Sequence, residues 1–473
     1  TIQARFNATP DGDVTEKTTA IPFNANVQAS GLAAADPALA SALGNSLTLT
    51  ANGRVRDGIA DVQSAHLQTP TADLRFTGLI GGSNLNGKLV AHVPALSRFG
   101  QLASLKLRGA LDLTADLTGV PDDGRIIAAV DGKATQFGTG IAALDGLTGG
   151  RLGLKGTISK LPRSGYGFGD LRLTGAHATA RLDGQATVEI ANIDARVTIP
   201  DLKRADNRLS GRAEMIAKLT GTVELPDARA TVTVTDARAL GRPVPRLILQ
   251  TTVTDLTGMI DARATLAGTV DGKPANGALR IAKQASGNWL LDNLDLRVGS
   301  VTLQGAVTVT DDRLAEGRLK IDAGNLDDLS PLVLTKLAGQ IHADTTLSIA
   351  DGGQNGSLSA QAQGVKVGTS ALDRLIAQLR VTDVYRRPVI DGDVSIDRAR
   401  IAGESISQIR LAAKGAANAS DIALTAQARG FALDTRGRLI AADDIRLELS
   451  RLTAQRDKRR LALTRPVTLT LLD

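Results

Sequence analysis

The side chains that could perform chemistry are few, and none completes a catalytic or metal-binding pattern. Residues 82–89 have the glycine spacing of a phosphate-binding loop, whose backbone N–H groups would cradle a phosphate. However, Leu89 lacks the hydroxyl that would reach Mg²⁺, and the following residues resemble a strand rather than the required helix. We therefore expect a hairpin with glycines here and no nucleotide site.

The histidines and acidic residues favour structural roles. The four histidines are separated in the sequence, and none has a second histidine three or four residues away: His66, His92, His177 and His342. We expect them on the polar face or at strand ends. Asp391 and Asp393 have only part of a calcium-loop ligand set, and most other acidic residues suit turns. We expect no catalytic residue, no metal site and no cofactor, so the protein is not expected to be an enzyme.

Composition narrows the class of partner. The net charge of +6 is small for 473 residues, and aromatic residues make up only 2% of the chain. Proteins that bind RNA or single-stranded DNA usually stack bases on aromatic side chains, so we expect no nucleic-acid partner. The densest basic cluster, residues 456–460, suits a solvated hairpin tip; an anionic membrane surface or partner is the alternative.

Two absences bear on location. The chain has no cysteine, which is compatible with an oxidising compartment, and no run of 18 apolar residues that would cross a membrane as a helix. Its first residue is threonine and no signal-peptide pattern precedes the first strand. We expect a segment of a longer protein, with any targeting signal or membrane anchor outside it.

The strongest pattern is an alternation of apolar and polar residues along almost the whole chain. In residues 105–117, leucine or alanine occupies most odd positions, and the even positions are mainly charged or threonine. Successive side chains of a β-strand point to opposite faces, so residues 105–117 predict a strand with one apolar face and one polar face.

Recurrent phrases separate the strands. One phrase is an apolar residue, two polar or small residues, then apolar-x-apolar, and its central pair suits a turn or β-bulge. It occurs at 168–173, 244–249, 291–296, 372–377, 406–411 and 442–447. Asp-Gly pairs favour tight hairpin turns, and they occur at 57–58, 131–132, 183–184, 271–272, 351–352 and 391–392. We expect an antiparallel meander of about 40 strands.

The sequence also has a longer repeat, and each of its units contains several strands. Short helical stretches are expected after Val93-Pro94, after Ile199-Pro200 and near residues 325–329. They divide one continuous segment, residues 1–473, into approximate units 1–119, 120–221, 222–348 and 349–473. A flat sheet of this length would expose its apolar face, so we expect an all-β, elongated, twisted and mainly antiparallel sheet that curls, with short helices at the repeat junctions.

These phrases, the Pro200-Asp201-Leu202 junction and the tail at 449–466 resemble the periplasmic region of the TamB family, AsmA-like envelope proteins of Gram-negative bacteria. The resemblance covers essentially the whole chain. It implies a U-shaped groove with an apolar inside that bridges the inner and outer membranes and conducts phospholipids. It also implies a periplasmic location, an inner-membrane anchor in an N-terminal segment outside this chain, and a role in outer-membrane protein assembly with a barrel partner of the TamA type.

The residues independently favour a lipid conduit, because each acyl CH₂ moved from water onto an apolar lining gains about 0.8 kcal/mol. The alternative is a structural or adhesive β-solenoid rod with a dry packed core, which would favour a stricter period. Candidate lining residues share one parity within their segments: Leu105, Leu107, Leu111, Leu113, Leu117, Val188, Ile190, Val232, Val234, Leu294, Leu296, Val298, Leu303, Val307, Val309, Leu424, Leu447 and Leu449.

Overall fold

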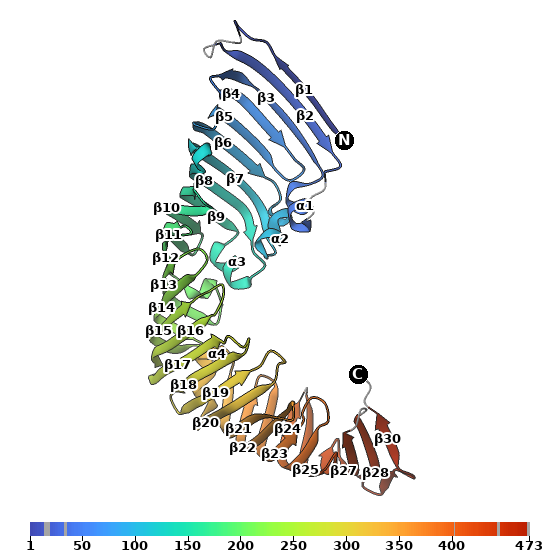
Figure 1. Cartoon of the computed structure of the whole chain (residues 1–473). Helices are drawn as coiled ribbons and strands as arrows, with labels where there is room; N and C mark the ends of the chain where they lie inside the picture. The colour runs from blue at the N-terminus through green and yellow to red at the C-terminus, as the bar shows by residue number, and fades with distance from the viewer. Residues whose placement is uncertain (14–18, 33–35, 402, 442–444, 471–473) are drawn as a thin grey trace. The chain divides into compact units, whose positions relative to one another are not determined.

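The fold was analysed in a computed structural model that describes residues 1–13, 19–32, 36–401, 403–441 and 445–470 (Figure 1). Thirty β-strands account for most of these residues and form a single antiparallel sheet. The expected fold class, an all-β antiparallel sheet with short helices at junctions, is confirmed. The strands are fewer than expected because many contain 13 to 15 residues.

The chain divides into two compact units, Thr1–Val234 and Thr235–Asp473. The four repeat boundaries stay a prediction. The first unit contains β1 (Ile2–Ala8), β2 (Ile21–Ser30), β3 (Ser46–Arg56), β4 (Ile59–Gln68), β5 (Asp73–Ile80), β6 (Leu85–Val93), β7 (Arg108–Val120), β8 (Arg125–Gly138), β9 (Arg151–Leu161), β10 (Gly165–Gly175), β11 (Thr179–Ala186), β12 (Ala191–Ile199), β13 (Leu209–Gly221) and the start of β14 (Pro226–Ala239).

The second unit begins within β14. It contains β15 (Arg242–Thr254), β16 (Asp261–Val270), β17 (Lys273–Lys283), β18 (Trp289–Val298), β19 (Val301–Val309), β20 (Ala315–Ala323), β21 (Leu337–Ala350), β22 (Gly353–Val367), β23 (Ser370–Thr382), β24 (Val389–Ile401), β25 (Glu404–Ala416), β26 (Ala419–Ala428), β27 (Phe431–Ala441), β28 (Ile445–Arg456), β29 (Arg459–Ala462) and β30 (Val467–Thr470).

The helices are short and lie between strands. The first unit has α1 (Pro37–Leu43), η1 (Leu96–Phe99), α2 (Gly100–Ala103), η2 (Pro121–Asp123), α3 (Ala142–Thr148) and η3 (Leu202–Arg204), and the second has η4 (Leu326–Leu329) and α4 (Ser330–Val333). In the first unit every helix except η2 connects an even-numbered strand to the next odd-numbered one. Because neighbouring strands are antiparallel, these helices all lie on the same side of that unit's sheet, beyond the ends of its strands (Figure 1).

Three of the apolar-x-x-apolar phrases contain β-bulges, one of the two structures expected for them. The register shifts between Phe168 and Leu171 in β10, between Leu291 and Leu294 in β18 and between Ser407 and Arg410 in β25. The phrase at 372–377 in β23 keeps its register with both neighbouring strands. Residues three apart would face opposite sides of a regular strand, but the extra bulge residue returns both apolar side chains to one face. The phrase at 442–447 begins outside the described residues.

The prediction that Asp-Gly pairs mark turns is correct at only half of the sites. The pairs at 57–58, 271–272 and 351–352 form turns, whereas those at 131–132, 183–184 and 391–392 lie inside β8, β11 and β24. In β8 the aspartate faces the polar side while Gly132 lies opposite Leu113. A Cβ added at Gly132 would lie 2.8 Å from the Leu113 Cδ1, so glycine is needed there for space rather than for a turn.

A buried leucine anchors each predicted junction. Leu96, Leu202 and Leu326 begin η1, η3 and η4, and all three are buried. Leu326 forms a cluster with Val301 and Ala323, against which side chains of β21 and β22 also pack. The 3-10 helices are therefore fixed to the sheet through one apolar side chain each.

We predict that Leu326→Ala lowers the free energy of unfolding of the second unit by about 2–4 kcal/mol, because it removes a buried side chain and leaves a cavity. Urea denaturation followed by circular dichroism measures this loss. Val333→Ala is the matched control, since Val333 in the adjacent α4 is 52% exposed and its truncation should cost little. Equal losses in both variants would contradict the anchoring role.

Candidate functional site

A row of apolar side chains crosses the first unit on one face of the sheet, with a glycine, Gly156, at its position in β9. Each member lies directly opposite the next on the neighbouring strand, in the order Phe6, Ala25, Ala51, Ala65, Phe76, Leu89, Ala115 and Val130. Beyond β9 the row continues as Leu171, Leu182, Ala195 and Ala217. We call this side of the sheet the apolar face.

The second unit has a corresponding apolar face. From β15 to β28 the directly opposed residues are Leu249, Leu266, Gly277, Leu296, Leu303, Ile321, Ala343, Ala360, Ala377, Val394, Leu411, Leu424, Thr435 and Leu452. Thr435 is the one polar interruption in this row. Alternation along each strand therefore becomes a continuous surface across strands, which is a property of the register.

No second sheet covers either apolar face, since every described strand belongs to the same sheet. Most side chains on the apolar face are half-buried by their neighbours, and many of the fully buried ones are alanines. The accessible surface is 27,726 Å² for 49.1 kDa, whereas a compact protein of that mass exposes about 17,000 Å². The apolar face thus remains accessible to an apolar ligand.

Small residues shape the apolar face between large ones. Gly132 lies between Leu113 and Leu154 on the adjacent strands, and Gly277 lies between Leu266 and Leu296. A Cβ at Gly277 would approach the Leu296 Cδ1 to 2.9 Å, so the leucine lies over the glycine. This arrangement keeps the surface apolar and relatively smooth across several strands.

The register places twelve of the eighteen candidate lining residues on the apolar face: Leu111, Leu113, Leu117, Leu294, Leu296, Val298, Leu303, Val307, Val309, Leu424, Leu447 and Leu449. In the first unit, Leu113 and Leu117 pack against the buried cluster of Ala115, Val130 and Leu171. Val232 and Val234 lie half-buried in β14. Whether any of these residues contacts lipid stays a prediction.

Four candidates do not lie in strands. β7 begins at Arg108, so Leu105 and Leu107 precede it; the N–H of Leu105 donates to the carbonyl of Gly100 at 2.9 Å and ends α2. Val188 and Ile190 lie exposed in the turn between β11 and β12. The Thr187 hydroxyl accepts from the N–H of Ile190 at 3.1 Å and closes this turn, which the apolar alternation concealed.

Aromatic side chains on the apolar face were not among the candidates. Phe6, Phe23, Phe76 and Phe168 lie there in the first unit, and Trp289 and Phe431 in the second. Phe6 and Phe23 stack with ring centroids 6.3 Å apart. These aromatic residues occupy the same alternating positions as the aliphatic residues of their strands, and this spacing could have identified them. The candidates were chosen among aliphatic residues because the chain contains few aromatic ones.

The opposite face is polar, and histidine–aspartate contacts join some of its neighbouring strands. His92 lies 2.6 Å from Asp112, and His342 lies 3.0 Å from Asp322. His66 pairs with Asp73 at 2.7 Å, whereas His177 lies in a turn. The histidines therefore occupy polar-face or turn positions, as expected.

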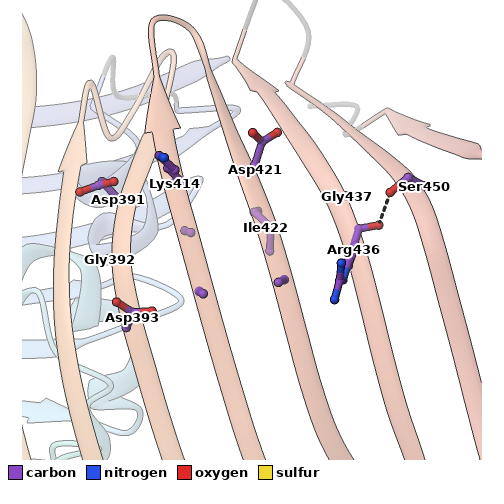
Figure 2. A pocket seen from close by; sticks show the side chains of 12 residues that line it. Asp391, Gly392, Asp393, Lys414, Asp421, Ile422, Arg436, Gly437 and Ser450 are labelled. Carbon is purple, nitrogen blue, oxygen red and sulfur yellow. Dashed lines mark hydrogen bonds between the residues drawn. The ribbon is translucent and has the colours of Figure 1, made fainter.

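A hollow of about 680 Å³ lies over β24 to β28, and Figure 2 shows the side chains that line it. Its polar lining is mixed in charge and includes Asp391, Asp393, Lys414, Asp421 and Arg436. Asp391 and Asp393 lie within strand β24 rather than in a calcium loop. In the described part of the chain, no group of three histidine or acidic residues is placed to hold a metal ion.

An ion pair with a buried carboxylate joins η4 to two hairpins of the second unit. The side chain of Asp328 is 2% exposed and accepts from the Lys273 Nζ at 2.5 Å. Its other oxygen accepts from the backbone N–H and the hydroxyl of Ser300 at 2.8 and 2.9 Å. Burial raises the pKa of Asp328, but these hydrogen bonds lower it by more, so that it lies below its ordinary value.

Comparison with known proteins adds no identification: no protein-family model and no curated protein matches the chain. Among the described residues, no helix is long and apolar enough to cross a bilayer. The argument for function therefore depends on the apolar face.

Proposed function

We propose that this chain is a conduit that carries phospholipid acyl chains along its apolar face, as part of a periplasmic bridge between the inner and outer membranes of a Gram-negative envelope. The observation that supports the proposal is the cross-strand apolar row within each unit, which Thr435 alone interrupts with a polar side chain, with no second sheet over it among the described strands. The resemblance to the TamB family, drawn from the sequence, points to the same function.

The apolar face suits transport better than tight binding. A tail of 16 carbons on an apolar surface gains roughly 13 kcal/mol relative to water at about 0.8 kcal/mol per CH₂. Because each row repeats similar aliphatic side chains from strand to strand, a tail that shifts by one strand exchanges one apolar environment for another. Movement along the sheet then has a low barrier, and no covalent chemistry is needed.

The alternative is a structural or adhesive rod with a dry core. A dry core requires a second layer over the apolar side chains, but the described strands all belong to one sheet and most of these side chains remain half-exposed. This observation favours the conduit. Under the conduit proposal, a TamA-type barrel and an inner-membrane anchor outside this chain are the expected partners.

We predict that the purified chain retains phospholipid from the cells that produce it. Native mass spectrometry of the purified protein, followed by organic extraction and identification of the lipids, is the direct measurement. A rod with a filled core would be free of lipid. Recovery of lipid-free protein that also takes up none from phospholipid vesicles would overturn the conduit.

A further inference from the structure

The few charged side chains on the apolar face follow a rule. The register places six charged residues there: Lys160, Lys273, Lys283, Glu404, Arg456 and Arg459. Lys273 pairs with Asp328, and Glu404 pairs with Arg429. Within the described residues the other four have no ion-pair partner, and all four are cationic. The apolar face thus presents unpaired positive charge and, at these registered positions, no unpaired carboxylate.

These four cations lie at or next to strand ends, and three of them lie beside an aromatic ring. Lys160 lies near the end of β9 on the same face as Ile158. It lies directly opposite Tyr166, which is 53% exposed. Lys283 lies opposite Trp289, which is 41% exposed. Tyrosine and tryptophan suit the boundary between an apolar region and water, because one part of each side chain is apolar and another is polar.

After Lys160 and Lys283, the third cationic position on the apolar face consists of two arginines. Arg456 and Arg459 lie directly opposite each other across the two-residue turn between β28 and β29. The Arg456 guanidinium lies 5.6 Å from the centre of the Phe431 ring. Leu461, on the same face, lies opposite Ala454. Two cations and an aromatic ring therefore meet where the apolar face ends.

Two pairs of opposed arginines elsewhere in the sheet are each neutralised by one aspartate. On the polar face, Asp170 lies 2.7 Å from both Arg172 and Arg181, which oppose each other. Asp261 similarly contacts the opposed Arg263 and Arg280 at 2.8 and 3.0 Å. Like charges directly opposite each other are destabilising, so these carboxylates remove a repulsion.

Arg456 and Arg459 have no such carboxylate among the described residues. An anion bound between them would supply the neutralisation that aspartate supplies on the polar face. A phosphodiester fits this position, because guanidinium groups donate paired N–H bonds to its oxygens. The apolar side chains beside it would take the ligand's hydrocarbon part, so the anion belongs to an amphipathic molecule rather than to free phosphate.

We propose that Lys160, Lys283 and the Arg456–Arg459 pair hold the phosphate groups of phospholipids whose acyl chains lie on the apolar face. This inference rests on the proposed conduit function and adds to it that the phosphate is recognised at strand ends. The conduit therefore selects phospholipids over uncharged diacyl lipids. The aromatic side chains next to these cations lie beside the glycerol backbone of the bound lipid, between its phosphate and its acyl chains.

The test compares two lipids with the same tails. The purified chain is incubated with equal amounts of dioleoyl phosphatidylglycerol and dioleoylglycerol, and the bound ratio is measured by native mass spectrometry. In the variant with Lys160→Gln, Lys283→Gln, Arg456→Gln and Arg459→Gln, we expect the preference for the phospholipid to fall about tenfold, as for loss of charge-assisted hydrogen bonds. Retention of dioleoylglycerol should be unchanged.

A control variant removes four exposed lysines from the polar face: Lys88→Gln, Lys133→Gln, Lys320→Gln and Lys366→Gln. It should keep the wild-type ratio. A wild-type chain that binds both lipids without preference, or a fourfold apolar-face variant that keeps the preference, overturns the phosphate sites alone. A wild-type chain that binds neither lipid overturns the conduit and the phosphate sites with it.

Discussion

Replacing Leu113 with arginine is expected to reduce phospholipid transfer by roughly two orders of magnitude. Leu113 lies in the middle of β7, opposite Ala91 and Gly132, and packs against the buried cluster of the first unit. A guanidinium there has no carboxylate opposite it and lies about 17 Å from one end of the strand and about 24 Å from the other at 3.4 Å per residue, too far for its side chain to reach water beyond the strand ends. A charge in a hydrocarbon environment costs about 3 kcal/mol, which corresponds to a factor of about 150.

Transfer is measured with a fluorescent phospholipid that moves between donor and acceptor vesicles in the presence of the purified chain. Thr118→Arg is the matched control, because Thr118 lies in the same strand but on the exposed polar face, opposite Asn86 and Ile127. It should transfer lipid at the wild-type rate. Circular dichroism checks that both variants keep their strand content. Wild-type transfer by a folded Leu113→Arg variant would show that lipid does not follow the apolar face.

Replacing Asp328 with alanine is expected to destabilise the second unit locally by about 1.5–3 kcal/mol, as for the loss of hydrogen bonds to a charged group. The substitution leaves the Lys273 ammonium without its buried partner and removes the acceptor for two hydrogen bonds from Ser300. Because these partners are in different hairpins, the η4 helix should separate from the turns that it holds. Hydrogen exchange at the Ser300 amide, followed by mass spectrometry of the peptide, measures the opening directly.

Two comparisons make this result specific. Asp312→Ala removes an exposed turn carboxylate and should leave the exchange of Ser300 unchanged. Because the pKa of Asp328 is lowered in the folded state, its stabilisation is present above the ordinary aspartate pKa of about 4 and is lost as the pH falls through the lowered value. The wild-type and Asp328→Ala chains should therefore differ most at neutral pH. Equal exchange of Ser300 in both chains at neutral pH would contradict the role of the pair.

Much of the fold could be predicted because its signals are local. A period of two defines a strand with two different faces, and it identified Leu111, Leu113 and Leu117 as neighbours on one face before any pairing was known. The apolar-x-x-apolar phrases predicted a turn or a bulge for the same reason, and a bulge does compensate for the local break in alternation between Leu291 and Leu294.

The errors arose where a local signal had two physical meanings. Val188 and Ile190 alternate like strand residues, but the Thr187 hydroxyl closes a turn around them. Asp-Gly suits a turn, yet Gly132 is required inside β8 to make room for the Leu113 side chain of the next strand. In each case the deciding contact involves a backbone geometry or a neighbour that the alternation does not specify.

By itself, the sequence determined that this protein is an antiparallel β-sheet with one apolar and one polar face, because the direction of each side chain follows from the strand backbone. Only the tertiary structure decided which residues lie opposite each other, since register depends on every turn and bulge between two strands. Lys273 and Asp328 are 55 residues apart in the sequence, and neither predicts the other. The same register made the apolar rows and placed the four cations that lack an ion-pair partner among the described residues at or next to strand ends, three of them beside aromatic rings.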